Sequence, residues 1–244
     1  MQYDGWQWHK DFLTCDLLAG WRHGFFSKAV YPQTPKELHG YLAGSGVAKT
    51  VKQVHGVEIV CAETISGQSD QEPVLADGLW SNQQDQSIWV CSADCVPILI
   101  GDRRLGTVMA IHAGWRGTAG GILGVGLKIL QAQGSRLTDL RIALGPAISG
   151  AVYQVQQDVA DQVTAILQQR HVGVTPDVKP NHCLLDIRAV QYQFLVEMGI
   201  DTSQIAIAPF CTYQNPEYFF SYRRGDIQKV QWSGIIANSG AVSI

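Results

Sequence analysis

The chain has 244 residues, of which 46% are hydrophobic and 16% charged, and its formal net charge is -3. This composition is typical of a globular protein with a substantial core and excludes a disordered chain. No run of Lys or Arg marks a nucleic-acid surface, so neither DNA nor RNA is expected as a partner. The N-terminus lacks the apolar stretch of a secretory signal, and no apolar run reaches the ~20 residues of a membrane span. We therefore expect a cytoplasmic protein without a membrane partner.

The predicted elements alternate irregularly along the chain. Strands are expected at 50–54, 57–63, 87–92, 96–101, 105–113, 140–145, 183–187, 205–208, 218–222 and 232–237, because these runs are short, β-branched or aromatic, and bounded by Gly, Asn or Asp. Loops are expected at 66–78 and 174–182. Helices are expected from about 118 to 133, within 155–170, and after Asp186. Many strands with few helices predict an α+β fold with mixed sheets, in one domain spanning 1–244.

The segment "HAGWRGTAGG" combines a strand end with a glycine-rich helix start. His112 is expected at the C-terminal end of a buried strand, where sites of α/β type gather. Arg116 offers donors that suit phosphate, Thr118 is a plausible N-cap, and Gly117 permits close approach of a ligand or another backbone. The segment therefore predicts an anion cradle at the helix start. A glycine-packed helix joint with a solvated Arg is the alternative.

Two further segments place polar groups inside apolar strands. In "CSADCVPILIG", Asp94 is a candidate base or orienting group, and Cys95 a candidate nucleophile or thiolate ligand, although a lone buried Cys is more often inert. In "KQVHGVEIV", His55 and Gly56 indicate a bulge or tight hairpin that aims the histidine inward. Each signal is weak alone. Together His55, Cys95 and His112 form a His₂Cys set with an open fourth position, which is typical of catalytic zinc.

Six motifs, in this order, resemble those of the YfiH/YlmD-like family: "KQVHG", "ADGLW", "CSADCVPILI", "AIHAGWRGTAGGI", "ALGPAISGAVYQV" and "CTYQNPEYFFSYRRG". The family is also labelled polyphenol oxidase or laccase-domain and is related to the mammalian protein FAMIN. The resemblance covers roughly residues 50 to 237. It implies a fold with two mixed sheets layered between helices (αββα), and it implies zinc bound by His55, Cys95 and His112.

The resemblance also implies zinc-dependent chemistry on purine nucleosides. This comprises phosphorolysis of adenosine, inosine, guanosine or methylthioadenosine, and deamination of adenosine. Purine nucleoside and phosphate are then the expected partners, with phosphate near Arg116, Gly117 and Thr118, and Asp94 a candidate proton shuttle. Lys28 stands where the family has an arginine and is a further phosphate candidate. Where the family often has cysteine, this chain has Ala147.

Three alternatives stay open at this point. A copper-dependent polyphenol oxidase is one, because a His₂Cys site also binds Cu(II). However, the seven histidines contain no His-x-His pair of the kind that builds a trinuclear copper cluster. A cysteine hydrolase with Cys95 as nucleophile and His112 as base is the second. A metal-stabilised interaction module without turnover is the third. The sequence leaves two smaller roles undecided: whether Trp115 stacks on a purine or seals the core, and whether Arg223 reaches the cleft.

Overall fold

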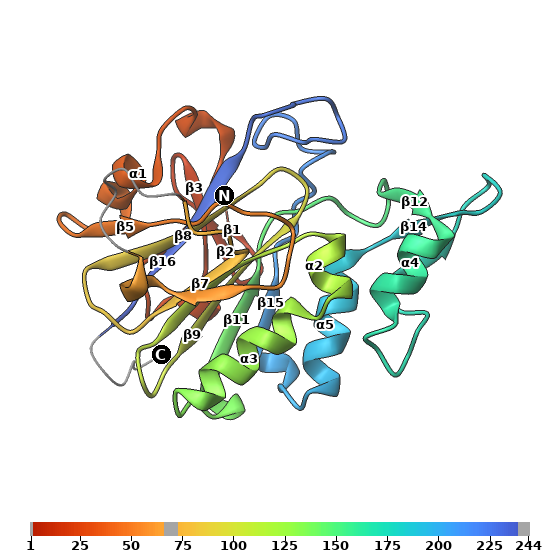
Figure 1. The fold of residues 1–244 in the computed structure, drawn as a ribbon. Coiled ribbons are helices and arrows are strands. Elements are labelled where there is room, and N and C mark those ends of the chain that lie inside the picture. Colours follow the sequence, from red (N-terminus) through yellow and green to blue (C-terminus); the bar gives the residue numbers. More distant parts are fainter. Residues whose placement is uncertain (1, 66–72, 239–244) are drawn as a thin grey trace.

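The computed structural model describes residues 2–65 and 73–238 (Figure 1). Three sheets hold the described strands. The larger two are mixed, as the sequence predicts, because each contains both parallel and antiparallel neighbours. The first sheet runs β1 (Gln2–Tyr3), β2 (Trp6–Trp8), β3 (Phe12–Cys15), β4 (His23–Phe26), β16 (Gln231–Ile236), β8 (Gln86–Ser92), β5 (Val47–Lys49). The second runs β15 (Ile205–Ile207), β11 (Leu140–Leu144), β9 (Val96–Asp102), β10 (Val108–Ala113), β7 (Gly78–Ser81), β6 (Ile59–Cys61).

Alternating side chains on the central strands serve two cores. On β10, Met109 and Ile111 belong to the core beneath the helices, whereas Val108 and Ala110 belong to the core between the two large sheets. Because successive side chains of a strand point to opposite faces, a strand covered on both sides must be apolar at nearly every position. This explains the unbroken apolar runs that the sequence shows in these strands.

Helices cover the outer faces of the two sheets, which gives the layered αββα arrangement. Helix α1 (Pro35–Leu42) packs Leu38 and Leu42 against the first sheet. Helices α3 (Ile122–Ala132) and α5 (Ile187–Glu197) cover the second sheet (Figure 1). Within the described residues, no helix has both the length and the apolarity to cross a membrane.

The helix predicted at 118–133 is in fact two helices. Helix α2 (Trp115–Ala119) begins after Gly114, and α3 starts after Gly121, whose φ of +78° breaks the helical path. Thr118 is therefore not an N-cap but lies inside α2, where its buried hydroxyl accepts a hydrogen bond from Gln191 Nε2 at 3.0 Å. The N-cap role predicted for Thr118 is therefore wrong, whereas anion binding by Arg116 stays a prediction.

A small third sheet and helix α4 (Gln157–Thr164) lie at one end of the molecule (Figure 1). The sheet runs β12 (Gln154–Gln156), β14 (His182–Leu185), β13 (Val174–Pro176). Part of the predicted loop 174–182 is thus an edge strand, where Pro176 is tolerated at the strand's end. The other predicted loop, 66–78, lies partly outside the described residues.

Two predicted strands are wrong. In 50–54, Lys52 makes an isolated bridge to Leu75 and no ladder forms. In 218–222, side chains take the place of a neighbouring strand, since Phe220 N–H donates to Gln231 Oε1 and Ser221 N–H donates to Asp226 Oδ2. The strands β1 to β4 of the first sheet were not predicted, because each has only two to four residues and forms no extended apolar run.

Candidate metal centre

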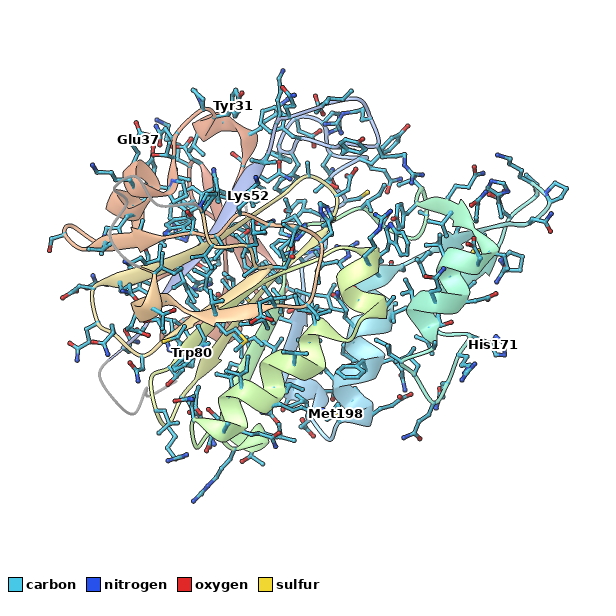
Figure 2. All side chains as sticks on the ribbon, viewed as in Figure 1. Tyr31, Glu37, Lys52, Trp80, His171 and Met198 are labelled. Carbon is cyan, nitrogen blue, oxygen red and sulfur yellow. The ribbon has the colours of Figure 1, made fainter. Side chains whose placement is uncertain are left out.

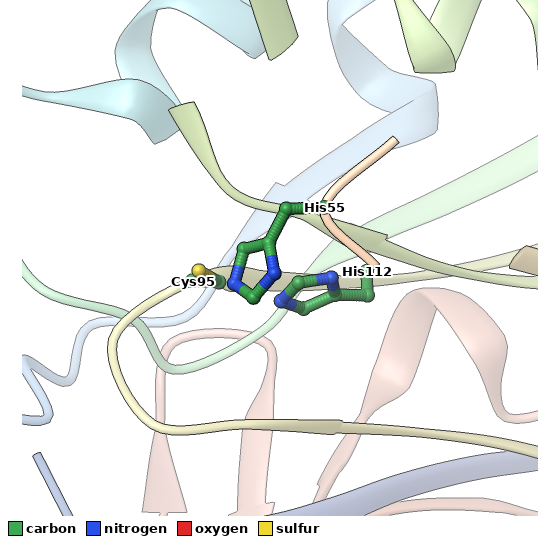
Figure 3. Close-up of side chains that lie close together, drawn as sticks. All are labelled: His55, Cys95 and His112. Atoms are coloured by element: carbon green, nitrogen blue, oxygen red, sulfur yellow. The ribbon is translucent and has the colours of Figure 1, made fainter. Parts of the chain in front are cut away.

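Three side chains that are far apart in the sequence lie close together at one end of the central strands β9 and β10 (Figure 3). Cys95 ends the turn between β8 and β9, and His112 lies near the end of β10, opposite Pro97. His55 comes from the turn that precedes β6. One ligand atom from each residue lies within 4.8 Å of the others, and the two imidazole rings are 4.8 Å apart at 85°. The structure thus brings together the His₂Cys set that the sequence suggested.

Asp77 connects the two histidines. Its carboxylate is fully buried, and Oδ1 accepts hydrogen bonds from His112 Nδ1 and from the backbone N–H of His55, both at 2.9 Å. Oδ2 accepts the N–H of Gly56 at 2.6 Å and of Val54 at 3.2 Å. Because Nδ1 of His112 is a donor here, Nε2 is left to face the centre, as in the carboxylate–histidine pairs of metal sites. In the sequence, Asp77 is marked only by its place in the motif "ADGLW".

The turn that carries His55 is held in an uncommon conformation. His55 has φ of +61°, which costs free energy for a residue with a side chain. The hydrogen bonds to Asp77 stabilise it on one side. On the other, the Gln53 side chain pairs with the backbone of Cys91 through Nε2 to O and N to Oε1, each at 2.8 Å. The expected bulge is therefore a turn fixed by two side chains, and His55 is exposed to solvent within it.

The three groups change one another's protonation. Burial raises the pKa of Cys95, but hydrogen bonds and charge from His112 and His55 outweigh it and lower the pKa to about 7. Burial lowers the pKa of His112, whereas Asp77 and Cys95 raise it more strongly, to about 9. For Asp77 burial also raises the pKa, but the hydrogen bonds from His112 and the backbone lower it overall. Cys95 is thus an activated thiol beside a stabilised imidazolium.

The donors fit a metal ion. Two imidazoles and one thiolate suit zinc with an open fourth position, and the same set accepts copper. Bonds of about 2.0–2.3 Å would draw the three ligand atoms slightly closer together. Among the described residues this is the one group of three or more His, Cys, Asp or Glu side chains placed to share an ion. A trinuclear copper cluster would need further ligands, and the described residues offer no second group of this kind.

Glycines form the wall beside the ligands. A Cβ on Gly114 would lie 2.8 Å from Cys95 Sγ and 3.3 Å from His55 Cδ2. A Cβ on Gly117 would lie 2.9 Å from the carbonyl oxygen of Gly56, and one on Gly120 2.6 Å from Val57 Cγ1. Gly117 is therefore a packing position rather than a phosphate contact. Helix α2 rests on the His55 turn, which is the glycine-packed joint that the sequence left as an alternative.

Arg116 and Trp115 face outward from this joint. The Arg116 guanidinium lies 4.3 Å from the centre of the Trp115 ring. Both line a hollow of about 540 Å³ between α2 and α4, together with Gln162 and Ala165. Trp115 is half-buried against the core beneath the helices. Arg116 is exposed, so its donors are open to an anion.

Lys28 begins a short turn after β4, where its backbone N–H donates to Tyr218 O at 2.8 Å. No described contact connects its side chain to the three ligands, and its role stays a prediction. His171 projects from the loop that follows α4 (Figure 2).

Asp94, predicted as a proton shuttle, is occupied otherwise. Its Oδ1 accepts the Thr212 hydroxyl at 2.6 Å, and Oδ2 accepts the Ser221 hydroxyl at 3.0 Å and the Arg223 N–H at 2.7 Å. The side chain is buried, and the residue has φ of +98°. Three donors on two oxygens make Asp94 an anchor for the segment 208–230 between β15 and β16, called here the C-terminal loop. This arrangement argues against the shuttle, because protein donors already use both carboxylate oxygens.

The structure also shows a residue that the sequence analysis passed over. Tyr153 lies near Cys95, Asp94, Arg116 and Arg223, all of which act on its charge. Burial and the thiolate of Cys95 raise the pKa of Tyr153 to about 12, so its phenol stays protonated at neutral pH. It belongs to the motif "ALGPAISGAVYQV", and that position in the motif was the available signal.

The comparisons with known proteins agree with this architecture. The sequence profile described as multi-copper polyphenol oxidoreductase laccase matches residues 37–238. A purine nucleoside phosphorylase of Synechocystis sp. is 44% identical, over 96% of this chain and 98% of the relative. The crystal structure of YlmD from Geobacillus stearothermophilus has a TM-score of 0.86 at 26% identity, over 96% of this chain and 99% of that one. A Bacillus licheniformis hypothetical protein, YfiH, has a TM-score of 0.85 at 26% identity, over 97% and 100%.

Proposed function

The chain belongs to this laccase-domain family, the YfiH/YlmD-like family, and on that premise we propose that it is a zinc-dependent purine nucleoside phosphorylase. The observation that carries the proposal is the convergence of His55, Cys95 and His112, oriented by Asp77, beside the exposed Arg116. The printed name of the Synechocystis relative supplies the reaction class. Adenosine, inosine, guanosine and methylthioadenosine are the proposed substrates.

Phosphorolysis makes clear demands on such a site. A phosphate oxygen forms a bond to C1′ of the ribose, the C1′–N9 bond breaks, and its electron pair leaves with the purine, which takes up a proton. His55, Cys95 and His112 would hold zinc, which when bound supplies a Lewis acid. Asp77 fixes a proton on Nδ1 of His112, so that Nε2 is the nitrogen that would bind zinc once its own proton is lost. Arg116 would bind phosphate, since a guanidinium offers a fork of donors to its oxygens.

Deamination of adenosine at the same centre is part of the proposal. It replaces the amino group at C6 by oxygen from water and releases ammonia. The occupied carboxylate of Asp94 is not available as the proton carrier for this step. Because its co-reactant is water, deamination needs no phosphate, and it can be assayed separately from phosphorolysis.

The deciding experiment incubates the zinc-loaded protein with each nucleoside, with and without inorganic phosphate. We expect ribose 1-phosphate and free base only when phosphate is present, and inosine from adenosine in either case. Arg116→Ala should raise the KM for phosphate and leave zinc content unchanged. Absence of product from every nucleoside would eliminate the proposal and favour the interaction module without turnover. Loss of zinc from the Arg116 variant would instead show that Arg116 supports the metal.

Two rival functions, a cysteine hydrolase and a copper oxidase, can be tested at the same site. The lowered pKa of Cys95 beside His112 also suits a cysteine hydrolase. Such an enzyme would ignore chelators and lose activity on alkylation, whereas the zinc enzyme should lose activity with a chelator and regain it with zinc. The same ligands accept copper, so metal analysis of protein grown without added copper, with a phenol oxidation assay, tests the oxidase. Stoichiometric copper with fast phenol turnover would overturn the zinc assignment.

A further inference from the structure

Two neighbouring arginines in the C-terminal loop are used in opposite ways. Arg224 is consumed by the loop itself, since its guanidinium donates to the carbonyl oxygens of Thr212, Tyr213 and Phe219 and pairs with Asp226 Oδ2 at 2.7 Å. The Arg223 side chain makes one described hydrogen bond, from Nη1 to Gln154 O at 2.7 Å. Arg223 is exposed and has no ion pair with a carboxylate among the described residues. Its charge and most of its donors are therefore free for an external anion.

The backbone of Arg223 is fastened directly beside the metal ligands. Its N–H donates at 2.7 Å to the carboxylate of Asp94, the residue that precedes Cys95. Asp94 also accepts hydrogen bonds from the hydroxyl groups of Thr212 and Ser221. The C-terminal loop is thus bonded at several points to the turn that carries Cys95. Asp94 adopts its φ of +98° within this network. Strained residues that persist because their surroundings hold them tend to cluster at functional sites.

The Tyr153 ring packs against the Arg223 side chain and positions it. The Arg223 guanidinium lies 4.9 Å from the centre of the Tyr153 ring, a cation–π contact. The loop that carries Tyr153 is itself tied to the Cys95 turn, because Ile148 N–H donates to Asp94 O at 3.0 Å and Tyr153 N–H donates to Ser149 O at 3.1 Å. The ring thus supports one face of the guanidinium and the Gln154 carbonyl accepts from Nη1, whereas Nε and Nη2 make no hydrogen bond among the described residues.

We propose that Arg223 is a second phosphate-binding residue of this site, with Tyr153 and Asp94 as the residues that position it. The proposal rests on the proposed function and deepens it: Arg116 from helix α2 and Arg223 from the loop before β16 contact the phosphate from two sides. A doubly charged phosphate presents several acceptor oxygens, and two guanidinium forks match them better than one. Arg223 takes no part in holding the metal.

The test compares zinc-loaded wild type with Arg223→Gln, which removes the charge and keeps a polar side chain. The KM for inorganic phosphate should rise by ~10- to 100-fold, as expected for a lost hydrogen bond to a charged group. Zinc content should stay unchanged. Arg170→Gln is the matched control, because Arg170 is exposed on the loop after α4 and loses the same charge. Arg223→Lys should show a smaller rise than Arg223→Gln.

Two substitutions of Tyr153 separate positioning from general damage. Tyr153→Phe keeps the ring beneath the guanidinium and should leave the phosphate KM within about twofold of wild type, since the cation–π contact survives. Tyr153→Leu removes the ring and should raise the phosphate KM toward that of Arg223→Gln. Equal effects of Phe and Leu would refute the positioning role of the ring.

The outcomes for the two proposals are distinguishable. If wild type forms ribose 1-phosphate and Arg223→Gln has an unchanged phosphate KM, Arg223 does not bind phosphate, while the phosphorylase stands. If wild type forms no ribose 1-phosphate, the proposed function fails. Calorimetric titration of both zinc-loaded proteins with inorganic phosphate then decides the role of Arg223. Weaker binding by Arg223→Gln than by Arg170→Gln supports it, and equal or absent binding overturns it.

Discussion

Replacing Asp77 by Asn should weaken zinc binding without unfolding the protein. The side chain is fully buried and accepts four hydrogen bonds, two on each oxygen, from the N–H groups of Val54, His55 and Gly56 and from His112 Nδ1. An amide has one accepting oxygen and one donating nitrogen. In either orientation of Asn, its NH₂ group therefore opposes two donors.

The two orientations of the new amide at position 77 would affect different metal ligands, either the tautomer of His112 or the turn that carries His55. If the NH₂ replaces Oδ1, His112 must accept at Nδ1 and carry its proton on Nε2, which is the tautomer that cannot bind a metal. If it replaces Oδ2, the N–H groups of Val54 and Gly56 lose their acceptor and the turn of His55 loosens. Loss of such an outer partner typically costs 10- to 100-fold in metal affinity, or about 1.4–2.7 kcal/mol. We expect a weakening in this range.

Competition with a chromogenic chelator measures the zinc affinity of each purified variant. Asp102→Asn is the matched control, because Asp102 is also fully buried and its carboxylate also accepts backbone N–H groups, those of Arg104 and Leu105. That variant should lose stability and keep its zinc affinity. If Asp77→Asn binds zinc as tightly as wild type, Asp77 does not set the tautomer of His112 and the reasoning above is wrong.

Three further predictions follow from other parts of the structure. Gly114→Ala should abolish zinc binding measured by metal analysis, because its Cβ would press on Cys95 and His55, whereas Gly40→Ala has open space in α1 and should stabilise the fold by about 0.5–1 kcal/mol. Burial lowers the pKa of His23 from 6.5 to about 4, so the unfolded chain takes up a proton first as pH falls, and denaturation should show about 2 kcal/mol lost between pH 7 and pH 5; a His23→Gln variant that keeps this pH slope would contradict the assignment. Arg224→Gln should lower the melting temperature by releasing the C-terminal loop, and an unchanged melting temperature would show that its four contacts do not stabilise that loop.

Several features of the site could be predicted because they interrupt a local pattern. His112 and Cys95 stand where buried strands should be apolar, and such polar interruptions need a partner. Asp186 was read as the start of a helix, and its side chain does accept the N–H of Ala189 at that position. These signals depend on neighbours within a few residues, which is the range over which sequence patterns are informative.

Other features were misread because their meaning depends on distant residues. The glycines after His112 have the composition of an anion cradle, yet Gly117 is required by the carbonyl oxygen of Gly56, sixty-one positions earlier. Asp94 has the residue type of a proton carrier, yet Thr212 and Ser221 occupy its oxygens. A side chain's chemistry is set by what reaches it, and that is decided by tertiary contacts.

The sequence by itself predicted an α+β fold with mixed sheets, and its resemblance to the YfiH/YlmD-like family implied the layers. It also singled out the three metal-binding candidates, because each of them interrupts an apolar strand-like run. Only the tertiary structure decided that Asp77 links His55 to His112, that α2 is a packing joint, and that the backbone of Arg223 is bonded to Asp94, the residue before Cys95. The physical reason is separation along the chain. Hydrogen bonds between residues 77 and 112, or 94 and 223, leave no periodicity for a local pattern to reveal.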